Sequence, residues 1–110
     1  MSYLYIAQMD IPAEHEALFN RLYDEEHVPQ ILQVPGCRSC TRYKLDNSSK
    51  DGTPKYIAVY EVDSPEVVKS PEWRKAADTG EWAPKIRPHT MNRHHSMYLR
   101  IAGPVHAKRK

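Results

Sequence analysis

Apolar side chains occupy almost every position near the start of the chain. The stretch from Tyr3 to Met9 is rich in aromatic and branched residues, which predicts a β-strand. Alternate side chains of a strand point to opposite faces, so one face carries Tyr3, Tyr5, Ala7 and Met9, and the other carries Leu4, Ile6 and Gln8. Both faces are largely apolar, and we therefore expect both to be covered.

After Pro12 the apolar spacing changes and predicts a long helix from about Ala13 to Gln33. Its apolar stripe comprises Leu18, Phe19, Leu22, Val28, Ile31 and Leu32. Pro29 is expected to kink this helix near Glu26 to Val28, because proline cannot donate the backbone hydrogen bond that continues it. The turn Val34-Pro35-Gly36 ends the helix.

Two further strands are predicted, from about Cys37 to Leu45 and from Lys55 to Val62, with a polar, turn-rich connection over residues 46–54. Ser64-Pro65 and Ser70-Pro71 each combine a capping serine with a proline at the first helical position, which predicts an interrupted second helical region. A last strand is expected within Thr90 to Ile101.

The order strand, helix, strand, strand, helix, strand is that of a ferredoxin-like βαββαβ sandwich. We predict an α+β fold with an antiparallel four-stranded sheet and helices on one face. It forms a single domain over residues 1–103, followed by a basic C-terminal tail over residues 104–110. The apolar residues on the bare face of such a sheet need a cover, so we expect a homodimer formed through the sheet face.

Charge and hydropathy argue against several classes of protein. The net charge of +2, with 27% charged residues, is too even to indicate nucleic-acid binding. The start lacks the basic and apolar regions of a signal peptide. No apolar run approaches the length of a membrane span, so we expect a cytoplasmic protein without a membrane partner.

The two cysteines, Cys37 and Cys40, have a C-x-x-C spacing. They fall within a predicted strand, where residues three apart point to opposite faces, and not at the helix N-terminus that a redox pair needs. A structural zinc site would require four ligands, and no second cysteine pair exists. We interpret both as ordinary strand cysteines and expect no metal site.

One segment carries a resemblance to a known family. It consists of Phe19-Asn20-x-x-Tyr23-x-x-x-His27-Val28-Pro29, Leu32-x-Val34-Pro35-Gly36, Arg42-Tyr43 and the strand from Tyr56 to Glu61. These motifs and the order of elements resemble the dimeric α/β-barrel superfamily, and within it the EthD-like group named for ethyl tert-butyl ether degradation. The resemblance implies that the protomer's sheet packs against its partner's to form an α/β barrel, with a pocket between sheet and helices.

The superfamily handles small hydrophobic molecules, and the resemblance implies three alternatives. The first is a cofactor-independent enzyme of isomerase, decarboxylase or monooxygenase type, acting on a small aromatic or polyketide-like compound. The second is a non-catalytic ligand-binding or stress-associated barrel, and the third is a haem-dependent member. No residue identifies a haem ligand, so we expect no cofactor.

The resemblance nominates His27 for chemistry, with Tyr23 beside it, and their spacing of four residues puts both on one helix face. His27 is either a general acid or base, because imidazole titrates near neutral pH, or a structural residue that hydrogen-bonds a carbonyl freed by Pro29. Tyr23 orients His27, donates to a substrate oxygen, or packs as a core tyrosine.

The candidates for substrate binding are Tyr5, Tyr60, Trp73, His89 and His95. The three aromatic residues either line a pocket suited to a flat, partly oxygenated ligand or anchor the dimer. A strand through the last stretch places both histidines on one face, where they either gather at a pocket with His27 or form a surface or interface cluster, the interpretation that we favour.

Charged residues leave further alternatives open. Arg38, Arg42 and Arg93 either bind a carboxylate or form salt bridges at the dimer seam. Glu25 and Glu26 are expected on a solvated face of the long helix.

Overall fold

The structure is a computed structural model that describes residues 2–109. Met1 and Lys110, at the ends of the predicted domain and tail, lie outside the described residues. Along the chain the elements are β1 (Tyr3–Asp10), α1 (Ala13–Leu22), η1 (Tyr23–His27), α2 (Val28–Ile31), β2 (Cys37–Lys44), β3 (Tyr56–Val62), α3 (Glu66–Lys69), α4 (Pro71–Asp78), α5 (Trp82–Lys85), η2 (Arg87–His89) and β4 (Met91–Leu99).

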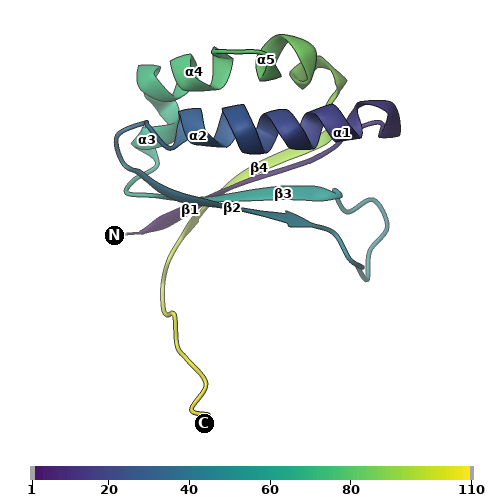
Figure 1. Cartoon of the computed structure of the whole chain (residues 1–110). Helices are drawn as coiled ribbons and strands as arrows, with labels where there is room; N and C mark the ends of the chain where they lie inside the picture. Colours follow the sequence, from purple (N-terminus) through teal and green to yellow (C-terminus); the bar gives the residue numbers. More distant parts are fainter. Residues whose placement is uncertain (1, 110) are drawn as a thin grey trace.

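The four strands form one antiparallel sheet in the order β2-β3-β1-β4, and the helices lie on one of its faces (Figure 1). This arrangement confirms the predicted α+β, ferredoxin-like sandwich. The two strands that read as apolar on both faces, β1 and β3, occupy the centre of the sheet.

The hydrophobic core lies between the sheet and the helical layer. The sheet contributes Ala7 and Met9 of β1 and Ala58, Tyr60 and Val62 of β3. The helical layer contributes Phe19, Leu22, Tyr23, Ile31, Val67, Trp82 and Ile86. Removing this apolar surface from water is the main favourable term in folding.

The other face of the sheet is open in the single chain. Strand pairing places Leu4 and Ile6 of β1 on it, together with Tyr98 of β4 and Val59 of β3. Tyr98 is 57% exposed, and Tyr43 of β2, on the same face, is 55% exposed. Exposed apolar and aromatic side chains on one sheet face are typical of a face that another protein covers.

The long helix runs from Ala13 to Ile31, and its middle, Tyr23–His27, is π-helical. The turn η1 widens the helix between α1 and α2. Pro29 lies at the start of α2, immediately after this turn, where its missing N–H interrupts the regular helical hydrogen bonds. The irregularity expected near Glu26 to Val28 therefore takes the form of a wider turn, a feature that recurs at functional sites.

The second helical region differs from the prediction at its start. Ser70 caps α4 as predicted, since its Oγ accepts a hydrogen bond from the N–H of Trp73 at 3.1 Å. The predicted cap at Ser64 is wrong: α3 begins after Pro65, and the N–H of Val67 instead binds the Ser64 carbonyl. The short segments α5 and η2, which lead into β4, were not expected.

The expectation that Cys37 and Cys40 point to opposite faces is also wrong. The register of β2 against β3 shifts between Cys37 and Ser39, so that Cys37 pairs with Val62 and Cys40 with Tyr60. Both partners are buried on the helix side, and both cysteines pack against the core. The bulge inserts one extra residue and restores the same face to positions three apart. Both thiols are free, and burial raises the pKa of each to about 11.

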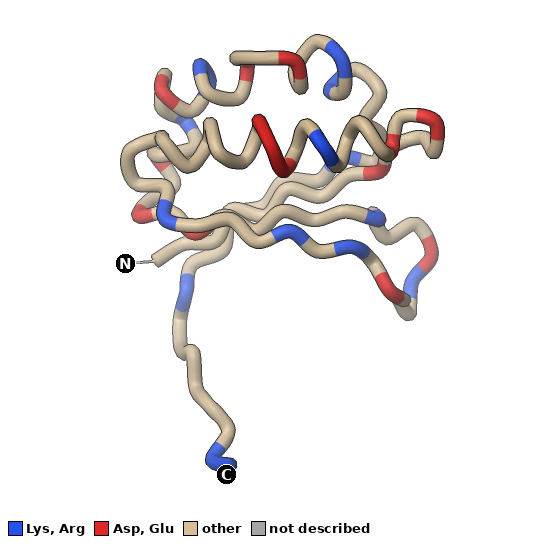
Figure 2. The backbone as a smooth tube through the Cα atoms, viewed as in Figure 1, with Lys and Arg blue, Asp and Glu red and all other residues tan. Residues whose placement is uncertain are grey.

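The C-terminal segment leaves β4 and extends away from the helical layer (Figure 1). Ile101 and Val105 in it are 91% and 90% exposed. Figure 2 shows basic residues at the far end of this segment and an acidic run, Asp24 to Glu26, in the middle of the long helix. Within residues 2–109, the helices are too short or too polar to cross a bilayer.

Candidate functional site

A cavity of about 400 Å³ lies between the sheet and the helical layer. Of the residues predicted for the site, it is lined by Tyr5, Tyr23, His27, Tyr60, Trp73 and His95. They come from β1, η1, β3, α4 and β4, so the fold gathers side chains that are up to 90 positions apart in sequence. A volume in this range suits a small organic ligand.

His27 stands on the π-helical turn and packs between two aromatic rings. Its imidazole stacks on the indole of Trp82, with ring centroids 4.2 Å apart and an interplanar angle of 17°. The ring of Tyr23 meets it edge-on at 5.1 Å. His27 is only 7% exposed, and the part that remains open faces the cavity.

The polar atoms of this stack are not all satisfied. Nδ1 of His27 is sealed from solvent and has no hydrogen-bond partner within residues 2–109. The predicted structural role, in which His27 binds a carbonyl freed by Pro29, therefore does not occur through Nδ1. Since Nδ1 is sealed, Nε2 is the nitrogen that a ligand can reach. Burial, and next the positive charge of Arg87, lower the pKa of His27 to about 4, so the imidazole is neutral at pH 7.

Tyr23 is buried between the long helix and the sheet. Burial raises the pKa of its phenol to about 12, so it stays protonated at every physiological pH. Its ring also meets the indole of Trp82 edge-on at 5.7 Å, and the guanidinium of Arg42 lies 4.4 Å from its centroid. Tyr23 thus holds the stack of His27 and Trp82 against the sheet.

A second group of rings also lines the cavity. Trp73 meets Tyr5 and Tyr60 edge-on, at centroid distances of 5.6 and 5.4 Å. His95 of β4 stacks on Tyr5 at 5.8 Å. These contacts are typical of well-packed aromatic clusters, and they present flat apolar surface with a few polar tips.

Trp82 is held in place by a carboxylate from the long helix. Glu26 accepts hydrogen bonds from the backbone N–H groups of Glu81, at 2.9 Å, and Trp82, at 2.8 Å. Gly80 adopts a φ of +93°, and a Cβ there would come within 2.5 Å of this carboxyl group. The prediction that Glu26 belongs to a solvated face is therefore wrong, because it fixes the chain at the start of α5.

Charged side chains lie around the cavity. Arg74, Arg87 and Arg93 line it, with Asp78 as the acidic residue among them. Arg87 donates to Asp78 at 2.7 Å and to the carbonyl of Ala77 at 2.7 Å, and its guanidinium lies 5.2 Å from the indole of Trp82. Within residues 2–109, Arg74 and Arg93 form no ion pair.

The other predicted arginines are engaged within the chain. Arg38 binds both carboxylate oxygens of Asp63, at 2.9 and 2.7 Å. Arg42 donates to Asp24 at 2.6 Å and to Asn20 at 2.8 Å. Neither lies on the cavity.

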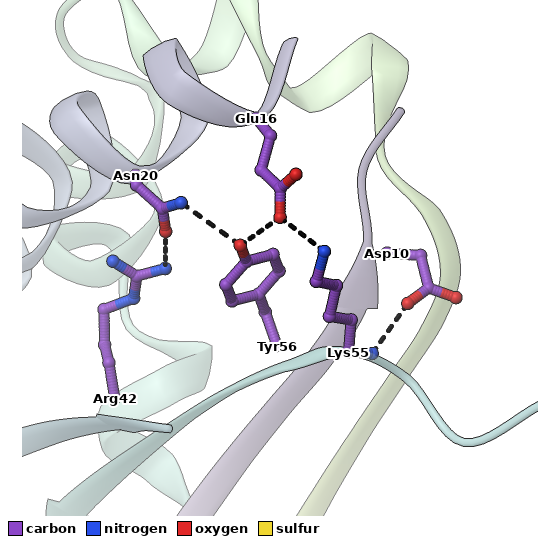
Figure 3. A network of polar contacts seen from close by, with 6 residues as sticks. All are labelled: Asp10, Glu16, Asn20, Arg42, Lys55 and Tyr56. Carbon is purple, nitrogen blue, oxygen red and sulfur yellow. Dashed lines mark hydrogen bonds and ion pairs between the residues drawn. The ribbon is translucent and has the colours of Figure 1, made fainter. Parts of the chain in front are cut away.

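A polar network connects the beginning of the long helix to the sheet (Figure 3). Glu16 accepts a hydrogen bond from Tyr56 and forms an ion pair with Lys55 at 2.7 Å. Asn20 donates to the Tyr56 hydroxyl at 3.2 Å and accepts from Arg42. Asn20 and Arg42, both part of the motifs that carry the family resemblance, therefore have a structural role: they dock the helix that carries Tyr23 and His27.

His89 lies apart from the cavity. It belongs to η2, before β4 begins at Met91, so the expectation that it shares a strand face with His95 is wrong. Its ring stacks on His15 of α1 at 3.8 Å. Within residues 2–109, no three histidine, cysteine, aspartate or glutamate side chains converge as a metal site would require.

Sequence reasoning does not assign Trp82, Arg74, Arg87 or Asp78 to the site. Trp82 is missed because α5 has four residues and shows no apolar period. The remaining three side chains follow a pattern that an ordinary solvated helix also shows, so no local signal distinguishes them.

Residues 2–101 match a family described as a domain of unknown function, DUF4286. No curated protein sequence matches the chain. Solved structures, by contrast, share its fold at low sequence identity.

One is an ethyl tert-butyl ether degradation (EthD) family protein from Bacillus halodurans, 15% identical, with a TM-score of 0.66 over 92% of this chain and 100% of that chain. A dimeric ferredoxin-like protein from an uncultured marine organism is 20% identical, with a TM-score of 0.68 over 96% and 93%. The haem-degrading protein MhuD from Mycobacterium tuberculosis, solved with two haems in its active site, is 17% identical, with a TM-score of 0.62 over 94% and 99%. The fold is thus that of the dimeric α/β-barrel, ferredoxin-like proteins.

Proposed function

The chain belongs to the DUF4286 family, and we propose that it is a cofactor-independent enzyme that binds a small, flat, oxygenated aromatic molecule in the cavity under its helices. The reaction is of isomerase or decarboxylase type, His27 is its catalytic residue, and Tyr23 positions the imidazole of His27. The substrate is bound by Tyr5, Tyr60, Trp73 and His95. The indole of Trp82 stacks on the imidazole of His27 and supports it.

The observation that carries this proposal is a neutral imidazole at the wall of an aromatic cavity. A pKa of about 4 leaves His27 uncharged at pH 7, which makes it a weak base there but a serviceable hydrogen-bond donor. Nδ1 is sealed without a partner. A sealed N–H without an acceptor is rarer than an acceptor without a donor, so we place the proton of His27 on Nε2.

In this tautomer, Nε2–H donates to an oxygen of the bound molecule. A carbonyl so bonded is polarised, and the negative charge that develops on its oxygen is stabilised. That charge arises when a water molecule at the cavity mouth takes an α-proton, or when the bond to a carboxylate breaks, carbon dioxide leaves with the carboxylate carbon, and water then protonates the remaining carbon. Neutral imidazoles with a lowered pKa serve as electrophiles of this kind. Tyr23, held protonated by burial, keeps the imidazole in its orientation.

The test is a turnover screen with hydroxylated aromatic acids and quinols, followed by NMR or mass spectrometry of the products. In the variant His27→Phe the ring still stacks on Trp82 but cannot donate. We expect it to lose at least tenfold in turnover while its melting temperature stays within a few degrees of wild type. Full turnover by a well-folded His27→Phe would overturn the assignment of His27.

A binding protein without chemistry is the second candidate. The observation in its favour is that no carboxylate within residues 2–109 orients His27 through Nδ1, as the histidines of catalytic triads are oriented. Equal ligand binding by wild type and His27→Phe, with turnover in neither, would establish this alternative.

A haem-dependent activity, the third alternative, does not fit His27. An axial histidine must offer a nitrogen lone pair to iron. In the tautomer that the sealed Nδ1 favours, the nitrogen facing the cavity carries a proton instead. If haemin added to the purified protein shifts its Soret band, His27→Phe is therefore expected to show the same shift as wild type.

We also propose that the open sheet face is the interface of a homodimer. The face carries Leu4, Ile6, Val59, Tyr43 and Tyr98, which a second copy would cover with the same surface. Each protomer then keeps its own cavity, on the helix side of its sheet. Two dimeric proteins among the solved structures of the same fold support this assembly.

A further inference from the structure

The geometry points to a ligand that carries a carboxylate, held at the mouth of the cavity by Arg93 and Arg74 while its aromatic ring lies inside. This inference rests on the proposed function, and it specifies the class of substrate: aromatic acids rather than neutral aromatic compounds.

The charge of the cavity is unbalanced. Three arginines line it, against the single carboxylate of Asp78. Asp78 is already occupied by Arg87, whose second nitrogen binds the carbonyl of Ala77. Arg93 and Arg74 therefore stand on the cavity without an internal counter-charge among residues 2–109.

The cations and the rings occupy different depths. Tyr60 and Trp82 are 2% and 3% exposed, whereas Arg74 and Arg93 are both exposed to solvent. A carboxylate at the mouth keeps part of its hydration, which avoids the large cost of burying a charge. An aromatic ring gains most from the deeper, drier part of the cavity. The arrangement thus favours a molecule that is anionic at one end and aromatic at the other.

Arg93 belongs to the binding wall and not to a remote surface. It comes from β4, two residues before His95, whose ring stacks on Tyr5. After burial, the charge of Arg93 is the next cause that lowers the pKa of His95, and it also acts on the phenol of Tyr5. An anion bound there would lie in the same positive field.

Guanidinium groups are well suited to this role. Their planar fork matches the two oxygens of a carboxylate, and they remain charged at all relevant pH values. The chain offers a matched arginine for comparison, because Arg38 forms its ion pair with Asp63 away from the cavity.

The experiment compares 2-naphthoate with the isosteric, neutral 2-naphthamide by isothermal titration calorimetry of the full chain. We expect wild type to bind 2-naphthoate at least tenfold more tightly than 2-naphthamide. Arg93→Gln should weaken 2-naphthoate about tenfold and change 2-naphthamide less than twofold, and Arg74→Gln should act in the same direction. Arg38→Gln is the control and should change neither affinity.

Two results would overturn the inference, and they are distinguishable. The first result is equal affinities for the two compounds, or an Arg93→Gln variant that binds 2-naphthoate as wild type does. Either outcome would refute recognition of a carboxylate without contradicting the proposed aromatic site. Absence of binding by both compounds, in a protein whose melting temperature is normal, removes the proposed function and the inference with it.

Discussion

The carboxylate of Glu26 accepts a hydrogen bond from the backbone N–H of Trp82 at 2.8 Å, although the two residues are 56 positions apart. This contact connects the π-helical turn that carries His27 to the start of α5, and it sets the indole against the imidazole. Because Gly80 has no Cβ, the carboxylate has room to sit there.

Substitution of Gly80 by alanine is expected to disturb the His27–Trp82 stack. A Cβ would come within 2.5 Å of the Glu26 carboxyl carbon and displace it from the two N–H groups. Loss of hydrogen bonds to a charged acceptor costs about 1–3 kcal/mol. Gly52→Ala is the matched control, because Gly52 also has a positive φ, of +82°, but a Cβ added there would meet nothing within 4 Å.

Chemical denaturation measures both variants. We expect Gly80→Ala to lose about 1–3 kcal/mol more stability than Gly52→Ala. Equal losses would mean that backbone strain alone matters at Gly80 and that the Glu26 contact is unimportant.

Stability should fall as the pH drops, in part because of His27. Its pKa is lowered from 6.5 to about 4 in the folded protein, so below pH 6.5 the unfolded chain binds a proton that the folded chain does not. His27 therefore lowers the free energy of unfolding only below pH 6.5, and the loss grows as the pH falls towards 4. Between pH 7.5 and 4.5 we expect wild type to lose about 2–3 kcal/mol more than His27→Phe. Parallel pH profiles of the two proteins would show that His27 titrates normally.

Association through the open sheet face should be sensitive to charge. Tyr98→Asp and Tyr43→Asp place a carboxylate on exposed positions of that face and are expected to give monomers in sedimentation velocity. Leu32→Asp is the control, since Leu32 is 39% exposed but follows α2 on the helix side. A dimer that survives both tyrosine substitutions would place the interface elsewhere.

The cysteines are expected to be unreactive. Burial raises the pKa of Cys37 and Cys40 to about 11, so only about one thiol in a thousand is ionised at pH 8. Reaction with a disulfide reagent should therefore be at least a hundredfold slower in the native protein than in concentrated guanidinium. A fast reaction of either thiol in the native state would contradict this prediction and favour a redox role for the cysteine pair.

The order of elements could be predicted because it follows from local patterns. Alternation assigned Ala7 and Met9 to the same face of β1, and the Ser70-Pro71 pair marked the start of α4. The bulge in β2 could not be predicted in this way. One extra residue between Cys37 and Cys40 moves every later side chain of the strand to the other face, and no residue type in the segment indicates a bulge.

The site was only partly predictable for a different reason. Tyr23 and His27 are neighbours along one helix, so their spacing brought them together at once. The backbone of Trp82 is held beside them by a hydrogen bond to Glu26. This contact joins two distant segments, and the hydrophobic pattern of neither segment indicates it. Arg74 of α4 and Arg93 of β4 likewise come from distant segments, and only the folded structure shows that both line the cavity.

Tryptophan resonances offer the most direct test of the cavity as a ligand site. The chain has two tryptophans, Trp73 and Trp82, and both line the cavity. In a spectrum of protein labelled with ¹⁵N-tryptophan, assigned through Trp73→Phe and Trp82→Phe, titration with 2-naphthol is predicted to shift both indole signals along one saturating curve. Indole signals that stay in place at saturating 2-naphthol, while other parts of the protein respond, would contradict the account.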